Sequence, residues 1–367
     1  MADPTLQTFC CIQTNMTRPG ADALVRFRSG PYNAVCILFS VFGILGAIYQ
    51  ILPRESYQST IRKPSTSSVR GRYIIVWLAT ADLLASSAVL VRSVSWVIGK
   101  TVVMSPTLDT YFCAVSSAWI QYFYTATCLW TLVYAIDVFK VVHEDRGMPK
   151  IYHIIAWGLP AVLCIIGLTI LYYPDINCHA SGSSAFARIL PNYFFTYLPI
   201  VIVMIVNPLL YWRTSIKAED MVVSVSGRFT HNERQHLRSL KLKFFCINLV
   251  FYICWLPNLV NAFLLWTLWD DLPRSFVLFD WYLMAVVNPL QALLNALVYR
   301  KWGDTKTYVV FPWTKHHLQK TKSLNDLGET NYILDSDSPS PNGRDSNGNN
   351  SFDESTKSLT FPGYGTL

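Results

Sequence analysis

Asp82, Arg92, Asp137 and Asp280 are ionisable residues that lie inside long apolar stretches of this chain. A charged side chain in a hydrocarbon layer is costly unless it faces a protein interior or meets a partner, so each of these residues is a functional candidate. The chemistry that they offer is charge pairing and ligand binding. We expect neither enzymatic activity nor a bound metal or cofactor.

A membrane-spanning bundle is needed to position such residues. The 367 residues are 52% hydrophobic and 14% charged, whereas soluble domains carry about 25% charged residues. A helix crosses a hydrocarbon layer in about 20 residues, and seven apolar runs reach that length. We predict an all-α, seven-helix transmembrane domain over residues 32–302, preceded by a polar segment (1–31) and followed by a largely disordered tail (303–367). The predicted spans are 32–52, 73–99, 112–139, 152–173, 192–212, 242–266 and 276–299.

The distribution of basic residues predicts the orientation of the bundle. Most of the 30 Lys and Arg residues lie in the loops after the first, third and fifth spans and in the tail. Because cytosolic loops are enriched in Lys and Arg, the tail is predicted to be cytosolic and the N-terminus lumenal or extracellular. Asn15, in the sequon Asn15-Met16-Thr17, is then open to glycosylation. The net charge of +7 follows this topology, so no nucleic-acid partner is expected.

The sixth span contains the run Phe251-Tyr-Ile-Cys-Trp255-Leu-Pro257. Pro257 has no backbone N–H, so the helix is predicted to bend there, while Phe251 and Trp255 project from one face. A bent helix with bulky aromatic side chains beside the bend is suited to be a moving part. The alternative is a tolerated proline kink whose aromatic residues face lipid or core.

These patterns resemble the rhodopsin-like G-protein coupled receptors. Phe-x-x-Cys-Trp-x-Pro is similar to their sixth-helix switch, and Leu78-Ala-Thr-Ala-Asp82 to their second-helix pattern. The resemblance implies that Asp82 faces a hydrated pocket coupled to activation, although an aspartate that only packs helices together is the alternative.

The chain also departs from that family. Asp137 matches the aspartate of the Asp-Arg-Tyr motif, but Val138 replaces the arginine, so the usual cytoplasmic ionic lock cannot form. Asn288-Pro289 is followed by Ala292 where a tyrosine is expected. Ile120 stands where amine receptors place an aspartate, which disfavours a plain amine ligand. The resemblance makes Asp137, Asn288 and Pro289 switch candidates, together with Asp82, Phe251, Trp255 and Pro257.

Two cysteines are predicted to form a disulfide bond. Cys113 begins the third span and Cys178 lies in the loop after the fourth, both on the predicted oxidising side. The rhodopsin-like family has such a bridge. Two unpaired thiols are the alternative.

Several unusual segments follow one another along the chain. They are Thr8-Phe-Cys-Cys11, Ala118-Trp-Ile-Gln121, Tyr152-His-Ile-Ile-Ala-Trp-Gly158, Leu171-Tyr-Tyr-Pro174, Asn207-Pro208 and Asn232-Glu-Arg234. Together they resemble the ocular albinism type 1 proteins, the pigment-cell receptors of melanosomes. The resemblance implies a receptor that couples to heterotrimeric G proteins and controls melanosome biogenesis, size, number and transport. It also implies L-DOPA, tyrosine and dopamine as ligands, arrestin and sorting adaptors as further partners, and a location in melanosomes, lysosomes or late endosomes and the plasma membrane.

We predict a ligand site around Arg92, whose planar guanidinium suits the carboxylate of an amino acid. Gln121, Trp255, Asn261 and Asp280 are its candidate neighbours. The alternatives are an ion pair with Asp280 or extension of the side chain to the membrane interface. The basic loop 213–241 is predicted to face the G protein, or else only to set the topology.

Two segments of the tail fit sorting signals. Tyr308-Val-Val-Phe311 matches a Tyr-x-x-bulky signal, and Glu329 with Ile333-Leu334 loosely matches an acidic dileucine signal. Two other classes of function stay open. One is a transporter or channel of an organelle membrane, which predicts paired charges and repeated, broken helices. The other is a seven-helix scaffold for melanosome biogenesis that does not couple to G proteins.

Overall fold

The computed structural model describes most of the predicted membrane domain and a short part of the tail. The described residues are 29–52, 54–56, 66–99, 106–143, 145, 147–172, 183–226, 231–267, 274–299 and 307–309. The helices are α3 (Ser29–Ile51), α4 (Thr66–Gly99), α5 (Pro106–Val142), α6 (Pro149–His153), α7 (Leu159–Tyr172), α8 (Ser183–Ser226), α9 (His231–Thr267) and α10 (Arg274–Tyr299). A π-helical turn, η2 (Ile154–Gly158), joins α6 to α7, and two strands, β1 (Arg54–Ser56) and β2 (Thr307–Val309), are also present.

The prediction of seven membrane spans is confirmed. Within the described residues, seven helical segments are long and apolar enough to cross a membrane. The fourth span combines α6, η2 and α7 into one continuous rod, and every other span is a single helix. The segments are Gly30–Ile51, Val69–Ile98, Tyr111–Val142, Pro149–Leu171, Phe194–Met221, Leu237–Leu264 and Ser275–Tyr299.

The chain divides into two compact units. The first comprises residues 1–51, 65–303 and 362–367 and holds the helices, and the second comprises residues 52–64 and 304–361. In the second unit β1 and β2 pair antiparallel, with Glu55 opposite Tyr308. A segment between the first two spans thus pairs with a segment after the seventh.

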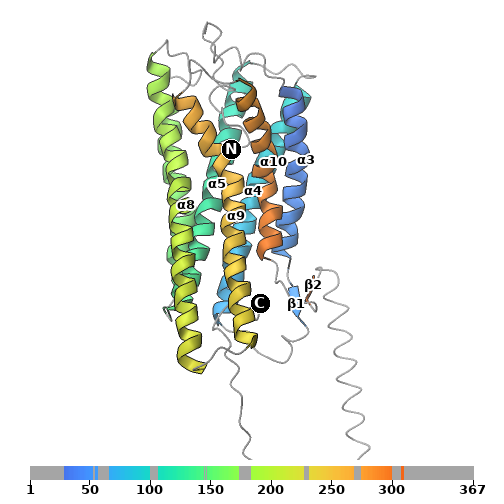
Figure 1. Cartoon of the computed structure of the whole chain (residues 1–367). Helices are drawn as coiled ribbons and strands as arrows, with labels where there is room; N and C mark the ends of the chain where they lie inside the picture. The colour runs from blue at the N-terminus through green and yellow to red at the C-terminus, as the bar shows by residue number, and fades with distance from the viewer. Residues whose placement is uncertain are drawn as a thin grey trace, which may run out of the picture. The chain divides into compact units, whose positions relative to one another are not determined.

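The helices form a closed bundle in which α3 packs against α4 and α10, and α5 contacts α4, α7 and α8 (Figure 1). Glycines allow the close approach of α3 to α10. A Cβ atom on Gly43 would lie 3.0 Å from the carbonyl carbon of Pro289, and one on Gly46 would lie 2.8 Å from the Leu293 Cβ. Small residues at helix interfaces are a general solution in membranes, because hydrocarbon chains leave little hydrophobic force between helices.

Aromatic rings join the second, third and fourth spans. Trp77 of α4 stacks on Trp130 of α5 with centroids 6.4 Å apart, and Trp157 of η2 lies edge-on to both, at 6.0 and 5.9 Å. His153 lies 5.2 Å from Trp130 and 5.1 Å from Trp77. These contacts fix the fourth span against the bundle.

Prolines mark the irregular points of the helices. Pro257 lies inside α9, and Figure 1 shows this helix changing direction in its C-terminal third, as the missing N–H predicts. In the fourth span, η2 ends two residues before Pro160. The wide π-helical turn lies where the proline removes an α-helical hydrogen bond.

The interpretation of residues 213–241 as a loop is wrong over most of its length. Helix α8 continues to Ser226 and α9 begins at His231, so both helices extend beyond the neighbouring spans (Figure 1). An ion pair between Lys241 and Glu219 ties the two extensions together. Apolar composition marks where a helix lies in the membrane, not where it ends.

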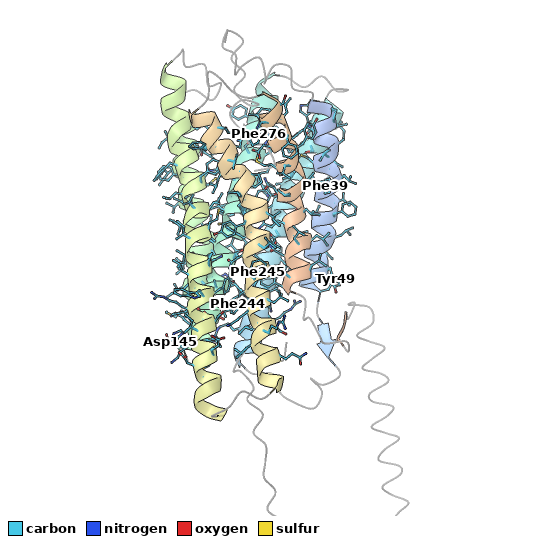
Figure 2. The ribbon with its side chains drawn as sticks, viewed as in Figure 1. Phe39, Tyr49, Asp145, Phe244, Phe245 and Phe276 are labelled. Atoms are coloured by element: carbon cyan, nitrogen blue, oxygen red, sulfur yellow. The ribbon has the colours of Figure 1, made fainter. Side chains whose placement is uncertain are left out.

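Buried and exposed side chains alternate along each helix with the helical period. Phe244 is 3% exposed, whereas the adjacent Phe245 is 61% exposed, and both are labelled on α9 in Figure 2. The same figure shows Phe39 on the outer side of α3. Large apolar side chains on the outside of the bundle are expected in a membrane, where they contact lipid and not water.

Candidate functional site

Polar residues in the bundle interior fall into three groups. We name the two ends of the bundle by their connections: the α9–α10 end, where α9 ends and α10 begins, and the α8–α9 end, where α8 ends and α9 begins. One group lies between these ends, around Trp255. The other two lie nearer to each end.

Trp255 is 1% exposed and packs against aromatic rings from two helices. Its ring lies 6.1 Å from that of Phe251 on α9 and 5.6 Å from that of Tyr124 on α5, the latter nearly perpendicular at 85°. The prediction that Phe251 and Trp255 share a face is confirmed. Tyr124 thus connects Trp255 to the third span.

Two asparagines join α9 to α10 beside the bend. Asn258 Nδ2 donates to Asn288 Oδ1 at 2.9 Å, and Asn288 Nδ2 donates to Asn258 Oδ1 at 3.2 Å. Asn258 Nδ2 also donates to the carbonyl oxygen of Cys254 at 2.9 Å. The side chain that follows Pro257 therefore pairs with a backbone carbonyl of the bend and with the neighbouring helix at once.

Asp82 is buried at the centre of the bundle, where Asn295 Nδ2 donates to its Oδ2 at 2.9 Å. Ser86, one turn along α4, donates to the carbonyl oxygen of Pro289 at 3.4 Å. Asn295 and Tyr299 have the four-residue spacing expected between the asparagine and the missing tyrosine of the rhodopsin-like pattern. Tyr299 is 6% exposed and lies edge-on to Tyr134 at 5.0 Å. Tyr299 therefore lies two helical turns beyond Ala292, the position at which Asn288-Pro289 predicts a tyrosine.

Near the α8–α9 end, the fully buried Asp137 has an arginine partner from another helix. Arg70 Nε of α4 donates to Asp137 Oδ1 at 2.7 Å, and Tyr152 of α6 donates to the same oxygen at 3.0 Å. The arginine absent after Asp137 in the sequence is therefore replaced in space by one from the second span.

Gly147 lies against this ion pair from the segment between α5 and α6. A Cβ atom there would lie 2.6 Å from Arg70 Cζ and closer still to its Nε. A side chain at residue 147 would therefore push the guanidinium away from its present position beside Asp137.

Near the α9–α10 end, Trp281 Nε1 of α10 donates to Asn261 Oδ1 of α9 at 2.8 Å. Asn261 and Asp280 are 0% and 4% exposed. Within the described part of the chain, Asn261 Nδ2 and Asp280 Oδ2 have no hydrogen-bond partner. The indole N–H of Trp255, another of the five predicted ligand-binding residues, has no hydrogen-bond partner in this part either.

The other predicted ligand residues lie in different settings. Gln121 of α5 donates to Thr196 Oγ1 at 2.6 Å and to Asn192 Oδ1 at 3.2 Å, which places its amide in the contact with α8. Arg92 lies on α4, partly buried, and the ion pairs of the described residues do not include one between Arg92 and Asp280.

The covalent and sorting predictions fall largely outside the described residues. Cys113 is disulfide-bonded, but Cys178 lies outside, so their pairing stays a prediction. Among the described cysteines, four lie buried in the bundle: Cys36, Cys128, Cys164 and Cys254. Tyr308 is a residue of β2. The glycosylation site Asn15 and the sorting residues Phe311, Glu329, Ile333 and Leu334 are outside the described part.

A sequence model of the family described as "Ocular albinism type 1 protein" matches residues 1–356. The chain belongs to the ocular albinism type 1 protein family. G-protein coupled receptor 143 of Homo sapiens is 32% identical over 321 residues, which are 82% of this chain and 78% of that receptor.

More distant similarities of this ocular albinism type 1 family member are to proteins whose names describe them as receptors or receptor-like. Cyclic AMP receptor-like protein C of Dictyostelium discoideum is 24% identical over 204 residues, 52% of this chain and 54% of that protein. Cadherin EGF LAG seven-pass G-type receptor 3 of Rattus norvegicus is 28% identical over 160 residues, 39% of this chain but only 4% of that protein. The chain is therefore a multi-pass membrane protein of receptor type.

Sequence reasoning missed several residues of the site in this family member. Arg70 precedes the apolar run of the second span, and nothing local indicates its partner. Asn295 and Tyr299 carried a usable signal in their four-residue spacing. Asn258 could have been suspected as a polar residue directly after the helix-bending proline.

Proposed function

We propose that this protein is a G-protein coupled receptor that binds a tyrosine-derived ligand near the α9–α10 end and engages a heterotrimeric G protein at the α8–α9 end. The ligands are L-DOPA, tyrosine or dopamine. The receptor acts in melanosome membranes, and in lysosomes or late endosomes and the plasma membrane, to control melanosome biogenesis, size and transport. The family membership and the named function of the human relative support this assignment.

The observation that carries the proposal is the ion pair between Arg70 and Asp137. The main argument against G-protein coupling was the missing arginine after Asp137. Arg70 supplies a guanidinium to the same carboxylate, and its side chain is 18% exposed whereas that of Asp137 is fully buried. A change that separates α4 from α5 would release this guanidinium, with its planar set of donors, toward the α8–α9 end.

The interior polar contacts offer a physical connection between the two ends. Trp255, the Asn258–Asn288 pair and the Asp82–Asn295 bond follow one another along α9 and α10. Rotation of α9 about its bend would break the reciprocal amide bonds with α10. On this proposal, the ligand acts by favouring one of two arrangements of these contacts.

The extended helices α8 and α9 form the proposed G-protein face. The ion pair between Lys241 and Glu219 holds them together, and exposed basic residues such as Arg213, Lys217 and Arg238 lie along them. This arrangement suits an acidic protein surface. Arrestin and sorting adaptors are further proposed partners on this side of the membrane.

The test is nucleotide exchange on purified Gi and Gq subunits by the full-length protein in lipid nanodiscs. We expect L-DOPA to accelerate exchange, and Arg70→Ala to raise exchange without ligand several-fold because Asp137 loses its partner. Arg92→Ala should abolish the response to L-DOPA while leaving expression intact. Lys150→Ala, which removes an exposed basic residue of α6 at the same end, is the matched control for Arg70 and should match wild type.

Failure of exchange with every subunit tested, from protein shown to be folded, would favour the two other classes. A transporter or channel would instead move labelled substrate into proteoliposomes. A scaffold would do neither and would retain its cytosolic partners in pull-down experiments.

A further inference from the structure

Asp280 is a buried carboxylate with an unmatched oxygen. The residue is 4% exposed, and its Oδ2 has no hydrogen-bond partner within the described part of the chain. A buried carboxylate that is neither paired nor hydrogen-bonded is strongly unfavourable in its charged form, so a cationic partner bound there would stabilise it.

The position of Asp280 on α10 directs it to the bundle interior. Val277, Met284 and Asn288 lie three residues before and four and eight residues after it, and all three are buried. Phe276 and Phe279 are 47% and 64% exposed and occupy the opposite side. Because residues spaced by three or four share a helix face, Asp280 faces neighbouring helices, not lipid.

Asn261 supplies a second unmatched group across the α9–α10 contact. Its Oδ1 accepts the indole N–H of Trp281, the residue after Asp280, at 2.8 Å. That bond fixes the orientation of the amide and leaves Nδ2, which has no partner in the described structure, as a donor. Asn261 itself is 0% exposed.

We propose that Asp280 binds the ammonium group of the ligand and that Asn261 donates a hydrogen bond to an acceptor oxygen of the same molecule. The inference rests on the proposed receptor function and specifies which residues of its site hold the ammonium group and an acceptor oxygen of such a ligand. The presence of Ile120 on the third span disfavoured amines in the sequence, but the seventh span provides a carboxylate in its place.

The chemistry of the set favours an organic ammonium. A divalent cation such as Ca²⁺ takes six or more oxygen ligands, often from several carboxylates. Here the unmatched groups at the α9–α10 end that carry this proposal are one carboxylate on α10 and one amide on α9, which are too few oxygen ligands for such a cation. An ammonium group offers three donors to Asp280 and neutralises its charge.

Direct binding of two small probes to the full-length protein in nanodiscs tests the proposal. Tyramine has an ammonium group and no carboxylate, and 3-(4-hydroxyphenyl)propionic acid has a carboxylate and no ammonium. We expect Asp280→Asn, which keeps the shape and removes the charge, to weaken tyramine binding by about tenfold to a hundredfold. The affinity of that variant for the propionic acid should equal that of wild type or exceed it.

Asp145→Asn is the matched control. Asp145 is exposed in the segment between α5 and α6, at the other end of the bundle (Figure 2), so its substitution should change neither affinity. Equal weakening of both probes by Asp280→Asn, or no weakening of tyramine, would overturn the assignment.

The outcome does not depend on whether Asp280→Asn folds. If that variant is not monodisperse and folded, the two probes are compared on wild type alone, and tighter binding of the propionic acid than of tyramine overturns the proposal. Binding is measured without a G protein. Tyramine binding through Asp280 without nucleotide exchange would therefore contradict the receptor function and support this site. Nucleotide exchange without tyramine binding would support the receptor function and contradict this site.

Discussion

At the scale of single residues, the molecule depends on side chains that meet across helices and on the glycines that let them meet. Arg70 reaches Asp137 beside Gly147. The cost of replacing Gly147 comes from this contact and not from its backbone, because its φ lies outside the left-handed region.

Gly147→Ala is expected to destabilise the protein by about 1–2 kcal/mol, because the new methyl group displaces a guanidinium that Asp137 holds in place. The measurement is thermal unfolding in nanodiscs. In an Arg70→Ala background the same substitution should cost almost nothing. Gly158→Ala is the control, since its Cβ would meet no atom nearer than 4.0 Å. Equal effects of Gly147→Ala in both backgrounds would contradict this account.

The reciprocal amide pair of Asn258 and Asn288 makes a second prediction at this scale. Either Asn→Leu substitution leaves one buried amide without its partner and should cost about 1–3 kcal/mol. The double variant should cost less than the sum of the two, because no orphaned amide remains. Thr80→Val, which removes a hydrogen bond within α4 only, serves as the control. Strict additivity in denaturant unfolding would refute a direct coupling.

At the scale of elements, α10 contacts both α3 and α9, and the two contacts are made by different kinds of interaction. Amide hydrogen bonds join it to α9, whereas close backbone packing joins it to α3. The packing contact is rigid and the amide contact can exchange partners. We therefore expect α9 to move relative to α10 more easily than α3 does.

Gly43→Ala tests the rigid contact. Its Cβ would lie 3.0 Å from both the Pro289 carbonyl carbon and Ser86 Oγ, and nearer still to the Pro289 oxygen. Since helix backbone cannot give way like a flexible side chain, we expect a loss of about 1–3 kcal/mol in thermal unfolding. Gly30→Ala, on the same helix with nothing within 4 Å of the added atom, should be neutral. A similar loss in both variants would show that the cost is not steric.

At the scale of the whole molecule, orientation in the membrane is the main prediction that the fold leaves open. The basic residues of the loops and tail predict a cytosolic tail and a lumenal N-terminus. The tail contains a second sequon, Asn349-Asn350-Ser351. In pigment cells, Asn15→Gln should abolish the mobility shift caused by a glycosidase, whereas Asn349→Gln should leave it unchanged. A glycan on Asn349 would invert the topology and with it the proposed G-protein face.

The amino-acid sequence by itself determined the seven spans and the shared face of Phe251 and Trp255 on the sixth, whereas the structure showed that this face points inward. Both are local properties: hydropathy over about 20 residues identifies a span, and the helical period places Phe251 and Trp255 together. The same local signal failed over residues 213–241. The polar residues there lie outside the membrane but still continue the two helices. Hydropathy locates the end of a membrane span and does not locate the end of a helix.

Only the tertiary structure decided which polar residues meet. Arg70 and Asp137 are 67 positions apart, and Asp82 and Asn295 are 213 apart. Each of these residues is recognisable alone as a costly polar group at or inside a span, so its need for a partner could be predicted. The identity of the partner depends on how the helices pack, and packing is set by contacts among all seven at once.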